Sequence, residues 1–193
     1  MGVEGQGSLV AGTRVHTDRG LVAIEDLAIG DVVLSPSDSL GDLVHRRVIR
    51  KFAHPDRLLQ RVSYLLEGKV IGVFVAVDQQ ILTEARGWVR AELLKPPGPK
   101  LVLMHREYVP CVENEAILKT AALGEGWVPR MRGDRLGTQL AFKPQMDVIA
   151  SNVPWKRPQG AEPDLRLRLT THGVEIENNA PFFIGAAGLT VRI

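Results

Sequence analysis

The sequence predicts an all-β protein. Apolar residues alternate with polar ones far more often than they recur at helical spacing, which is the pattern of half-buried strands. Short strand-like runs such as "HRRVIRKF" (45–52) and "LLQRVSYLL" (58–66) are separated by turn sequences, among them "DRG" (18–20), "HPD" (54–56) and "KPPGPK" (95–100). The long helical crossovers that parallel strands require are missing, so the sheet is expected to be mostly antiparallel.

Two segments are expected to be helical. "AIEDLAIGD" (23–31) predicts one short turn with Ile24 and Leu27 on one side, and "ENEAILKTAALGEG" (113–126) predicts about two turns ended by Gly124. Glu113 and Glu115 would then complement the dipole at a helix start. Further strands are expected in "GTRVHT", "DVVLSP", "VIGVFVAV" (buried on both faces), "RLRLTTHGVEIE" and twice in "PFFIGAAGLTVRI".

The composition favours one domain and excludes several classes of partner. The 193 residues suffice for a single core, and 24 Lys and Arg against 22 Asp and Glu leave no field that would gather nucleic acid or a membrane surface. Cys111 is the only cysteine, so no intrachain disulfide forms. No apolar run reaches a membrane span and no signal peptide is recognisable. The histidines are scattered, and no metal or other cofactor is expected.

The chain is expected to comprise a flexible lead-in (1–7) and one domain (8–193) with an elaborated or inserted region at about 104–164. Within it, residues 125–164 are rich in proline and carry Trp127, Trp155 and basic residues. This stretch is interpreted either as a binding loop for a protein partner or as an excursion whose tryptophans cover the sheet. Its arginines, expected to form a solvated basic loop rather than a nucleic-acid site, are Arg130, Arg132 and Arg135.

Four stretches resemble the Hint domain, which hedgehog autoprocessing domains and inteins share. They are "SLVAGTRVHTDRGLVAIEDLAIGDVVLS" (8–35), "HRRVIRKFAHPDRLLQRVSY" (45–64), "VAVDQQILTEARGWVRAELLKPPG" (75–98) and "VEIENNAPFFIGAAGLTVRI" (174–193). The pattern is most similar to the Hint domains that precede toxin tips in bacterial polymorphic toxins with RHS-type repeats. This resemblance implies a compact, horseshoe-like fold of mostly antiparallel strands with one or two short helices.

The resemblance also implies a set of catalytic positions. In the family, a Cys or Ser attacks its own preceding carbonyl, histidines in the second and penultimate blocks move protons, and a terminal His-Asn pair releases the second junction. Here Ser8 holds the nucleophile position, Gln79 and Ala180 stand at the two histidine positions, and Arg192 and Ile193 replace His-Asn. Glutamine does not titrate near neutral pH and isoleucine has no amide that could cyclise.

Two supporting positions of the family also differ. Ala76 stands where the second block has a threonine, and Gly173 where the penultimate block has an aspartate. The sequence therefore predicts a degenerate Hint domain that keeps the scaffold, has lost splicing and self-cleavage, and acts as a structural or partner-binding module. The alternative is residual N-terminal cleavage driven by Ser8. A third interpretation is a hydrolase that uses Cys111 and His105, although a cysteine between valines is typical of a small core residue.

Partners and location follow from the same resemblance. The expected partner is the flanking polypeptide or a toxin or cargo segment, with residues 125–164 as a further protein-binding region. The domain is expected in the cytoplasm or in an exported, larger bacterial protein.

Overall fold

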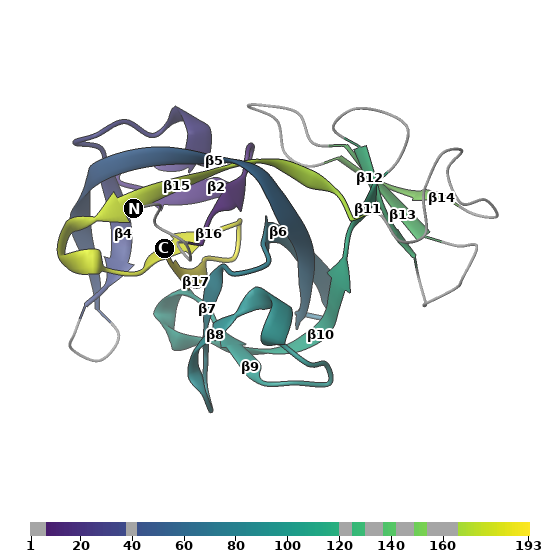
Figure 1. Ribbon diagram of the computed structural model, residues 1–193. Coiled ribbons are helices and arrows are strands. Elements are labelled where there is room, and N and C mark those ends of the chain that lie inside the picture. The colour runs from purple at the N-terminus through teal and green to yellow at the C-terminus, as the bar shows by residue number, and fades with distance from the viewer. Residues whose placement is uncertain (1–6, 38–41, 120–124, 130–136, 142–148, 154–165) are drawn as a thin grey trace.

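The computed structural model describes residues 7–37, 42–119, 125–129, 137–141, 149–153 and 166–193 (Figure 1). It confirms the all-β prediction, because strands dominate and the main strand pairs are antiparallel. In chain order the strands are β1 (Leu9–Val10), β2 (Arg14–Thr17), β3 (Gly20–Ala23), β4 (Val32–Pro36), β5 (Leu43–Leu66), β6 (Lys69–Ala76), β7 (Gln80–Thr83), β8 (Gly87–Arg90), β9 (Lys100–Val102), β10 (Tyr108–Ala116), β11 (Leu118–Lys119), β12 (Glu125–Pro129), β13 (Gly137–Ala141), β14 (Ile149–Val153), β15 (Arg168–Ile176), β16 (Phe182–Ile184) and β17 (Leu189–Arg192).

A large sheet carries the fold, and its strand order is β10-β9-β7-β17-β16-β2-β4-β5-β15-β1-β6. Strands β3 and β8 pair with β2 and β7, and β5 also pairs with β10 and β6. Strands β5 and β15 curve together over the lobe that holds β7, β8, β9 and β17 (Figure 1). The short 3₁₀ helices are η1 (Ile24–Asp26), η2 (Ala91–Leu93), η3 (Met104–Arg106) and η4 (Glu177–Asn179).

Strand β5 connects nearly every part of the main sheet. It pairs with β4 at one end, with β15 along its middle, and with β6 and β10 at the other end. The turn predicted at 54–56 is wrong, because the strand continues through these residues. Its register against β15 shifts there, and Asp56 has a positive φ of 56°. A bulge therefore accommodates Pro55, which has no N–H to give to the ladder.

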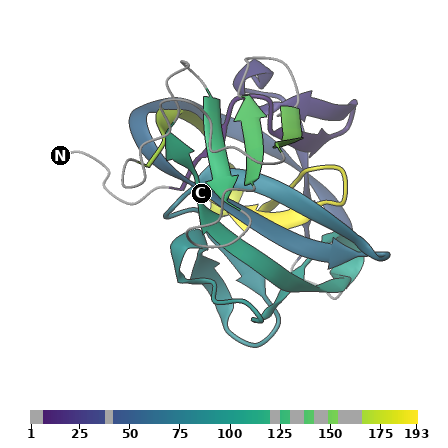
Figure 2. The same ribbon diagram turned by 90° about the vertical axis from the view of Figure 1, so that its right-hand side faces the viewer.

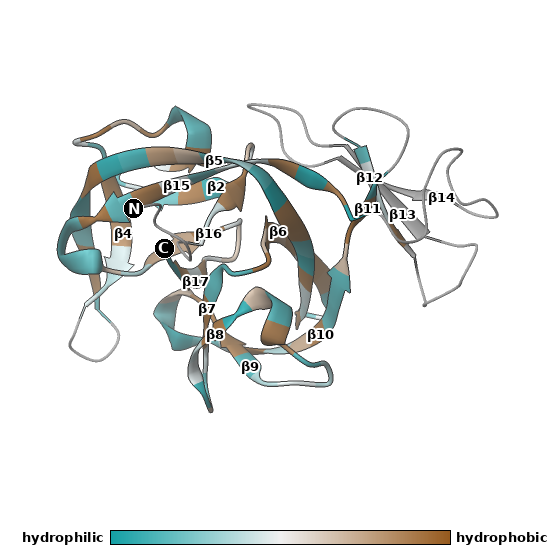
Figure 3. Cartoon of the chain, viewed as in Figure 1, coloured by the Kyte–Doolittle hydropathy of each residue, from teal (hydrophilic) through white to brown (hydrophobic). Residues whose placement is uncertain are grey.

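The main core lies between the curved strands β5 and β15 and the lobe that holds β7, β8, β9 and β17. Its largest fully buried side chains include Tyr64, Phe182, Ile81 and Leu101. Apolar residues alternate with polar ones along the strands that enclose it (Figure 3). Burying an aliphatic or aromatic side chain of this size contributes about 1.5–3 kcal/mol. The predicted burial of 70–77 on both faces is wrong at its start, since Val70 is 53% exposed near the β5–β6 hairpin end.

The two helical predictions have different outcomes. The short turn at 23–31 is confirmed by η1, whereas the helix predicted over 113–126 is wrong: β10 runs through Glu113 and Glu115 to Ala116. There β10 pairs with β5 from Cys111 to Ala116, and tertiary pairing overrides the local helical preference. The two glutamates therefore do not complement a helix dipole.

A second, four-stranded sheet has the order β11-β12-β13-β14 and lies beside the main body (Figures 1 and 2). It is joined to the main body by a small core cluster made of Val10, Leu59, Ile117, Val128 and Leu167. Trp127 is buried at 2% exposure, consistent with a side chain that covers the sheet. The predictions for Arg130, Arg132, Arg135 and Trp155 lie outside the described residues.

No helix among the described residues has the length and apolar character needed to cross a membrane.

Candidate functional site

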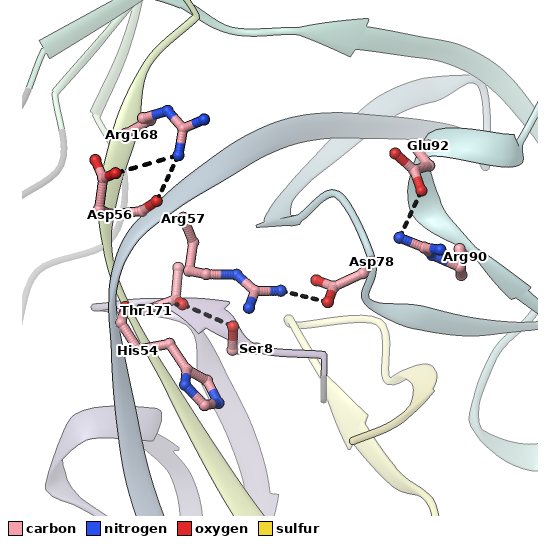
Figure 4. Close-up of polar contacts among 9 residues, drawn as sticks. All are labelled: Ser8, His54, Asp56, Arg57, Asp78, Arg90, Glu92, Arg168 and Thr171. Carbon is pink, nitrogen blue, oxygen red and sulfur yellow. Dashed lines mark hydrogen bonds and ion pairs between the residues drawn. The ribbon is translucent and has the colours of Figure 1, made fainter. Parts of the chain in front are cut away.

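Ser8 directly precedes β1, which runs between β15 and β6. The residue is fully buried, and its hydroxyl forms a hydrogen bond of 2.6 Å with the hydroxyl of Thr171 (Figure 4). The carbonyl of Ser8 accepts a hydrogen bond of 2.9 Å from the N–H of Ala76. Within the described part of the chain, the Ser8 hydroxyl therefore bonds to another hydroxyl and to no titratable side chain.

Gln79 is fully buried and lies against segments near both ends of the sequence. Its side-chain Nε2 donates to the carbonyl of Arg192 at 2.9 Å and to that of Gln80 at 3.0 Å. Gly7 approaches so closely that a Cβ there would lie 2.8 Å from Gln79 Oε1 and 2.9 Å from Gln79 Cα. Gln79 thus lies between the residue that precedes Ser8 and the residue that precedes Ile193.

The C-terminal strand is held by side chains of β7 and β8. The Arg192 guanidinium donates to Gln80 Oε1 at 2.7 Å and lies 4.7 Å above the ring of Trp88. Ile193 packs against the main core. A cation over an indole ring is attracted by about 0.5–2 kcal/mol, so Arg192 anchors the end of β17.

Ala180 follows η4 and also packs against the main core. Its N–H donates to the carbonyl of Glu177 at 3.3 Å. Ala180 and Ile193 each lie two residues beyond the Phe182–Val191 pair, at the same end of the β16–β17 hairpin. Gln79 therefore links the Ser8 segment, through Gly7, with Arg192, through its carbonyl. Among the described residues, Ala180 has no hydrogen bond to Ser8, Gln79 or Arg192.

The two supporting positions have structural roles. Ala76 is fully buried and binds the Ser8 carbonyl. Gly173 faces Phe52 across the β15–β5 pair, and a Cβ at Gly173 would lie 2.2 Å from the Phe52 ring. The ring therefore occupies the space that any side chain at position 173 would need.

Four residues of this site were missed by sequence reasoning: His54, Arg57, Asp78 and Thr171 (Figure 4). Arg57 and Asp78 form an ion pair, with Asp78 only 6% exposed. Within the described part of the chain, Asp78 Oδ1 and His54 Nε2 are buried without a hydrogen-bond partner. Burial, and then the cation of Arg57, lowers the pKa of His54 and favours the neutral imidazole.

The histidines and Cys111 do not form an alternative centre in the described residues, where no group of three metal-ligating side chains occurs. Cys111 is 1% exposed, and burial raises the pKa of its thiol to about 11. A buried thiol with this pKa holds almost no thiolate at neutral pH, which argues against Cys111 as a nucleophile. His105 lies in η3, outside β10, which carries Cys111. His16 binds the Gly185 carbonyl at 2.8 Å and so stabilises the fold.

An acidic pair on β10 gives the domain a pH-dependent stability. Arg61 lies 3.4 Å from both Glu113 and Glu115. Burial, and then the charge of Glu113, raises the pKa of Glu115 to about 7. An acid whose pKa is raised by folding stabilises the native state fully below its unfolded pKa, and this contribution is lost as the pH rises through its folded pKa.

We therefore expect Glu115→Gln to gain stability relative to the parent chain as the pH rises from 4.5 to 8. The relative gain is expected to be about 1–3 kcal/mol, because one pKa unit corresponds to about 1.4 kcal/mol. Urea unfolding of both chains at a series of pH values measures it. A difference between the two chains that does not change with pH would contradict the assignment.

The strand architecture and its matches among solved structures define the class of fold: the chain has the intein, or Hint, fold. The solution structure of a bacterial intein-like domain from Clostridium thermocellum matches it with a TM-score of 0.62 at 16% identity, covering 96% of this chain and 98% of that one. A DnaB intein from Synechocystis matches with a TM-score of 0.58 at 10% identity over 96% and 97%. No protein-family model and no curated protein matches the chain.

Proposed function

We propose that this intein-like domain keeps the autoprocessing scaffold but has lost protein splicing and self-cleavage. The observation that carries the proposal is the hydrogen bond between Ser8 and Thr171, because it leaves the Ser8 hydroxyl on a group that is no base at neutral pH. Gln79, at the position of the second-block histidine, holds Arg192 with its amide instead of moving a proton.

The C-terminal positions support the same proposal. Arg192 is engaged by Trp88 and Gln80, and Ile193, at the position of the family's asparagine, is packed against the core. Neither side chain can cyclise onto its own carbonyl as an asparagine amide does. Ala180 offers no proton donor at the penultimate-block position. Proton-transfer groups have thus been replaced by packing and hydrogen-bonding groups.

A scaffold without the reaction is proposed to act as a structural or partner-binding module. Its partner is proposed to be the flanking polypeptide or a toxin or cargo segment, as in the bacterial RHS-type toxins that the sequence resembles. We further propose a single domain over 8–193, with the four-stranded sheet β11–β14 as its elaboration. The attachment of this sheet to the main core through Ile117 and Leu167 supports that division.

Intact mass spectrometry tests the loss of cleavage. The chain, carrying a longer extension before Met1, is incubated for days from pH 6 to 9 with and without hydroxylamine, which traps esters. We expect an unchanged mass. A variant with Ser8→Cys and Gln79→His is the matched positive control, since it restores a thiol and a titrating base at these positions, and it is expected to release the extension when thiol is added.

One observation favours the alternative of residual cleavage by Ser8. His54 Nε2 is buried near the Ser8–Thr171 pair and has no hydrogen-bond partner among the described residues (Figure 4). The pKa of His54 is lowered by burial, so this candidate base is neutral at pH 7. Hydroxylamine-dependent loss of residues before Ser8, abolished by Ser8→Ala, would overturn the proposed inactivity. Its further abolition by His54→Gln would identify the base.

A further inference from the structure

A cavity of about 400 Å³ lies away from the Ser8 site. Strands β7 and β17 pair with each other, and Gln80 and Arg192 lie at one end of this pairing. Residues toward the other end of the same strands line the cavity: Leu82, Thr83 and Thr190. Phe183 and Leu103 add apolar surface. A cavity of this size accommodates a small molecule or one or two residues of a peptide.

Two threonines line the cavity, and both are only 2% exposed. The hydroxyl of Thr83 donates to the Gly87 carbonyl at 2.8 Å, so it is satisfied within the protein. The hydroxyl of Thr190 can donate to an acceptor group of a ligand that enters the cavity.

One wall of the cavity is formed by strained backbone. His105 and Arg106 both have a φ of 59°, the left-handed region that residues with a Cβ adopt at a cost of roughly 1–2 kcal/mol each. The segment is fixed by hydrogen bonds of 2.8 Å from Leu103 N–H to the Glu107 carbonyl and from Met104 N–H to the Gly188 carbonyl. Strain held in this way is typical of functional sites.

Arg106 supplies an exposed cation at the cavity, where it can pair with an anionic group of a ligand. Among the described residues, the side chains of His105 and Arg106 have no hydrogen-bond or ion-pair partner, and Arg106 is exposed. Glu84 is paired with Lys100 at 3.5 Å. Asp42, which directly precedes β5, is the remaining acid of the lining, and a carboxylate accepts hydrogen bonds from N–H donors.

We propose that this cavity binds the C-terminal carboxylate of a partner polypeptide whose last side chain is apolar. Arg106 pairs with the carboxylate, the hydroxyl of Thr190 donates to it, and Asp42 accepts a backbone N–H of the same peptide. The apolar side chain fills the space beside Phe183 and Leu103. This inference rests on the proposed function as a partner-binding module and supplies the chemistry of that partner.

Isothermal titration calorimetry on the full chain tests the site with the peptide acetyl-Gly-Gly-Leu-Leu, carrying either a free C-terminal carboxylate or an amide. We expect the carboxylate form to bind, and the amide form to bind at least tenfold more weakly. Arg106→Gln and Thr190→Val are expected to weaken the carboxylate form, the first at least tenfold, because charge-assisted hydrogen bonds are the stronger ones. Lys69→Gln, which removes an exposed cation at the distant β5–β6 hairpin, is the matched control and is expected to bind like the parent chain.

Equal affinity for the two peptide forms, full affinity of Arg106→Gln, or no binding of the carboxylate form would each overturn the site. N-acetylleucine is titrated in a further experiment. If it binds as tightly as the peptide, the ligand is a small carboxylate rather than the end of a polypeptide, and the proposed partner is wrong. Mass spectrometry of the same samples separates the two proposals. Cleavage before Ser8 contradicts only the proposed loss of self-cleavage. Failure of the carboxylate peptide to bind, without cleavage, contradicts only the proposed binding site.

Discussion

Replacing Arg57 by methionine is expected to lower the free energy of unfolding by about 3–5 kcal/mol, because it leaves the charge of a buried carboxylate unpaired. Asp78 is 6% exposed, its Oδ2 is bound by Arg57, and its Oδ1 has no partner among the described residues. Methionine keeps most of the volume of arginine, so the measured loss reports the charge more than a cavity. Urea unfolding near pH 7 measures it.

The matched control is Arg168→Met. Arg168 also pairs with an aspartate, Asp56, at 3.2 Å, but both side chains are about half exposed or more. Such pairs contribute about 0–1 kcal/mol. Adding Asp78→Asn to Arg57→Met is expected to recover part of the lost stability, since the buried charge disappears. Similar losses for Arg57→Met and Arg168→Met would show that Asp78 reaches solvent.

Replacing Gly173 by alanine is expected to destabilise the domain by about 2–3 kcal/mol, the upper part of the range for overpacked cores. The new Cβ would lie 2.2 Å from the Phe52 ring, so the ring must shift, and its packing against the His54 ring at a centroid distance of 5.0 Å is disturbed. Thermal and urea unfolding measure the effect.

Adding Phe52→Leu to Gly173→Ala is expected to recover much of the stability, because the smaller side chain gives the Cβ room. Phe52→Leu alone is the control for the lost ring. If the losses of the two single variants simply add in the double variant, the clash is not the cause.

The sequence was sufficient for the fold class because the strands of this protein alternate clearly and are bounded by turn residues. It was insufficient at positions where pairing with a strand distant in the sequence decides the local backbone conformation. Residues 113–116 have helix-forming neighbours but are held extended by β5, and "HPD" at 54–56 forms a bulge inside a continuous strand because β15 supplies its partner. Local preference cannot report either contact.

The site shows the same division. The positions of Ser8, Gln79 and Arg192 could be named from sequence blocks, and in the structure Gln79 lies against Gly7, which precedes Ser8, and binds the Arg192 carbonyl. Thr171 could not be named, since it lies 163 residues from the serine it binds. Asp78 offered one signal: a carboxylate directly after the apolar run "VFVAV" needs a buried partner. Arg57 supplies it from β5, and no spacing rule connects the two.

The bridge between Leu118 and Arg166 has a consequence for how this domain tolerates change in length. The chain leaves the main body and returns to it at adjacent points, so the two ends of the excursion are held together by the fold itself. Because the entropy cost of closing a loop grows only with the logarithm of its length, the segment between these residues can be lengthened or shortened at little cost to the main sheet. The contacts of Val128 with the small core cluster set the remaining cost. The junction is thus a natural place for inserted sequence, where a new recognition element can be gained without disturbing the curved strands.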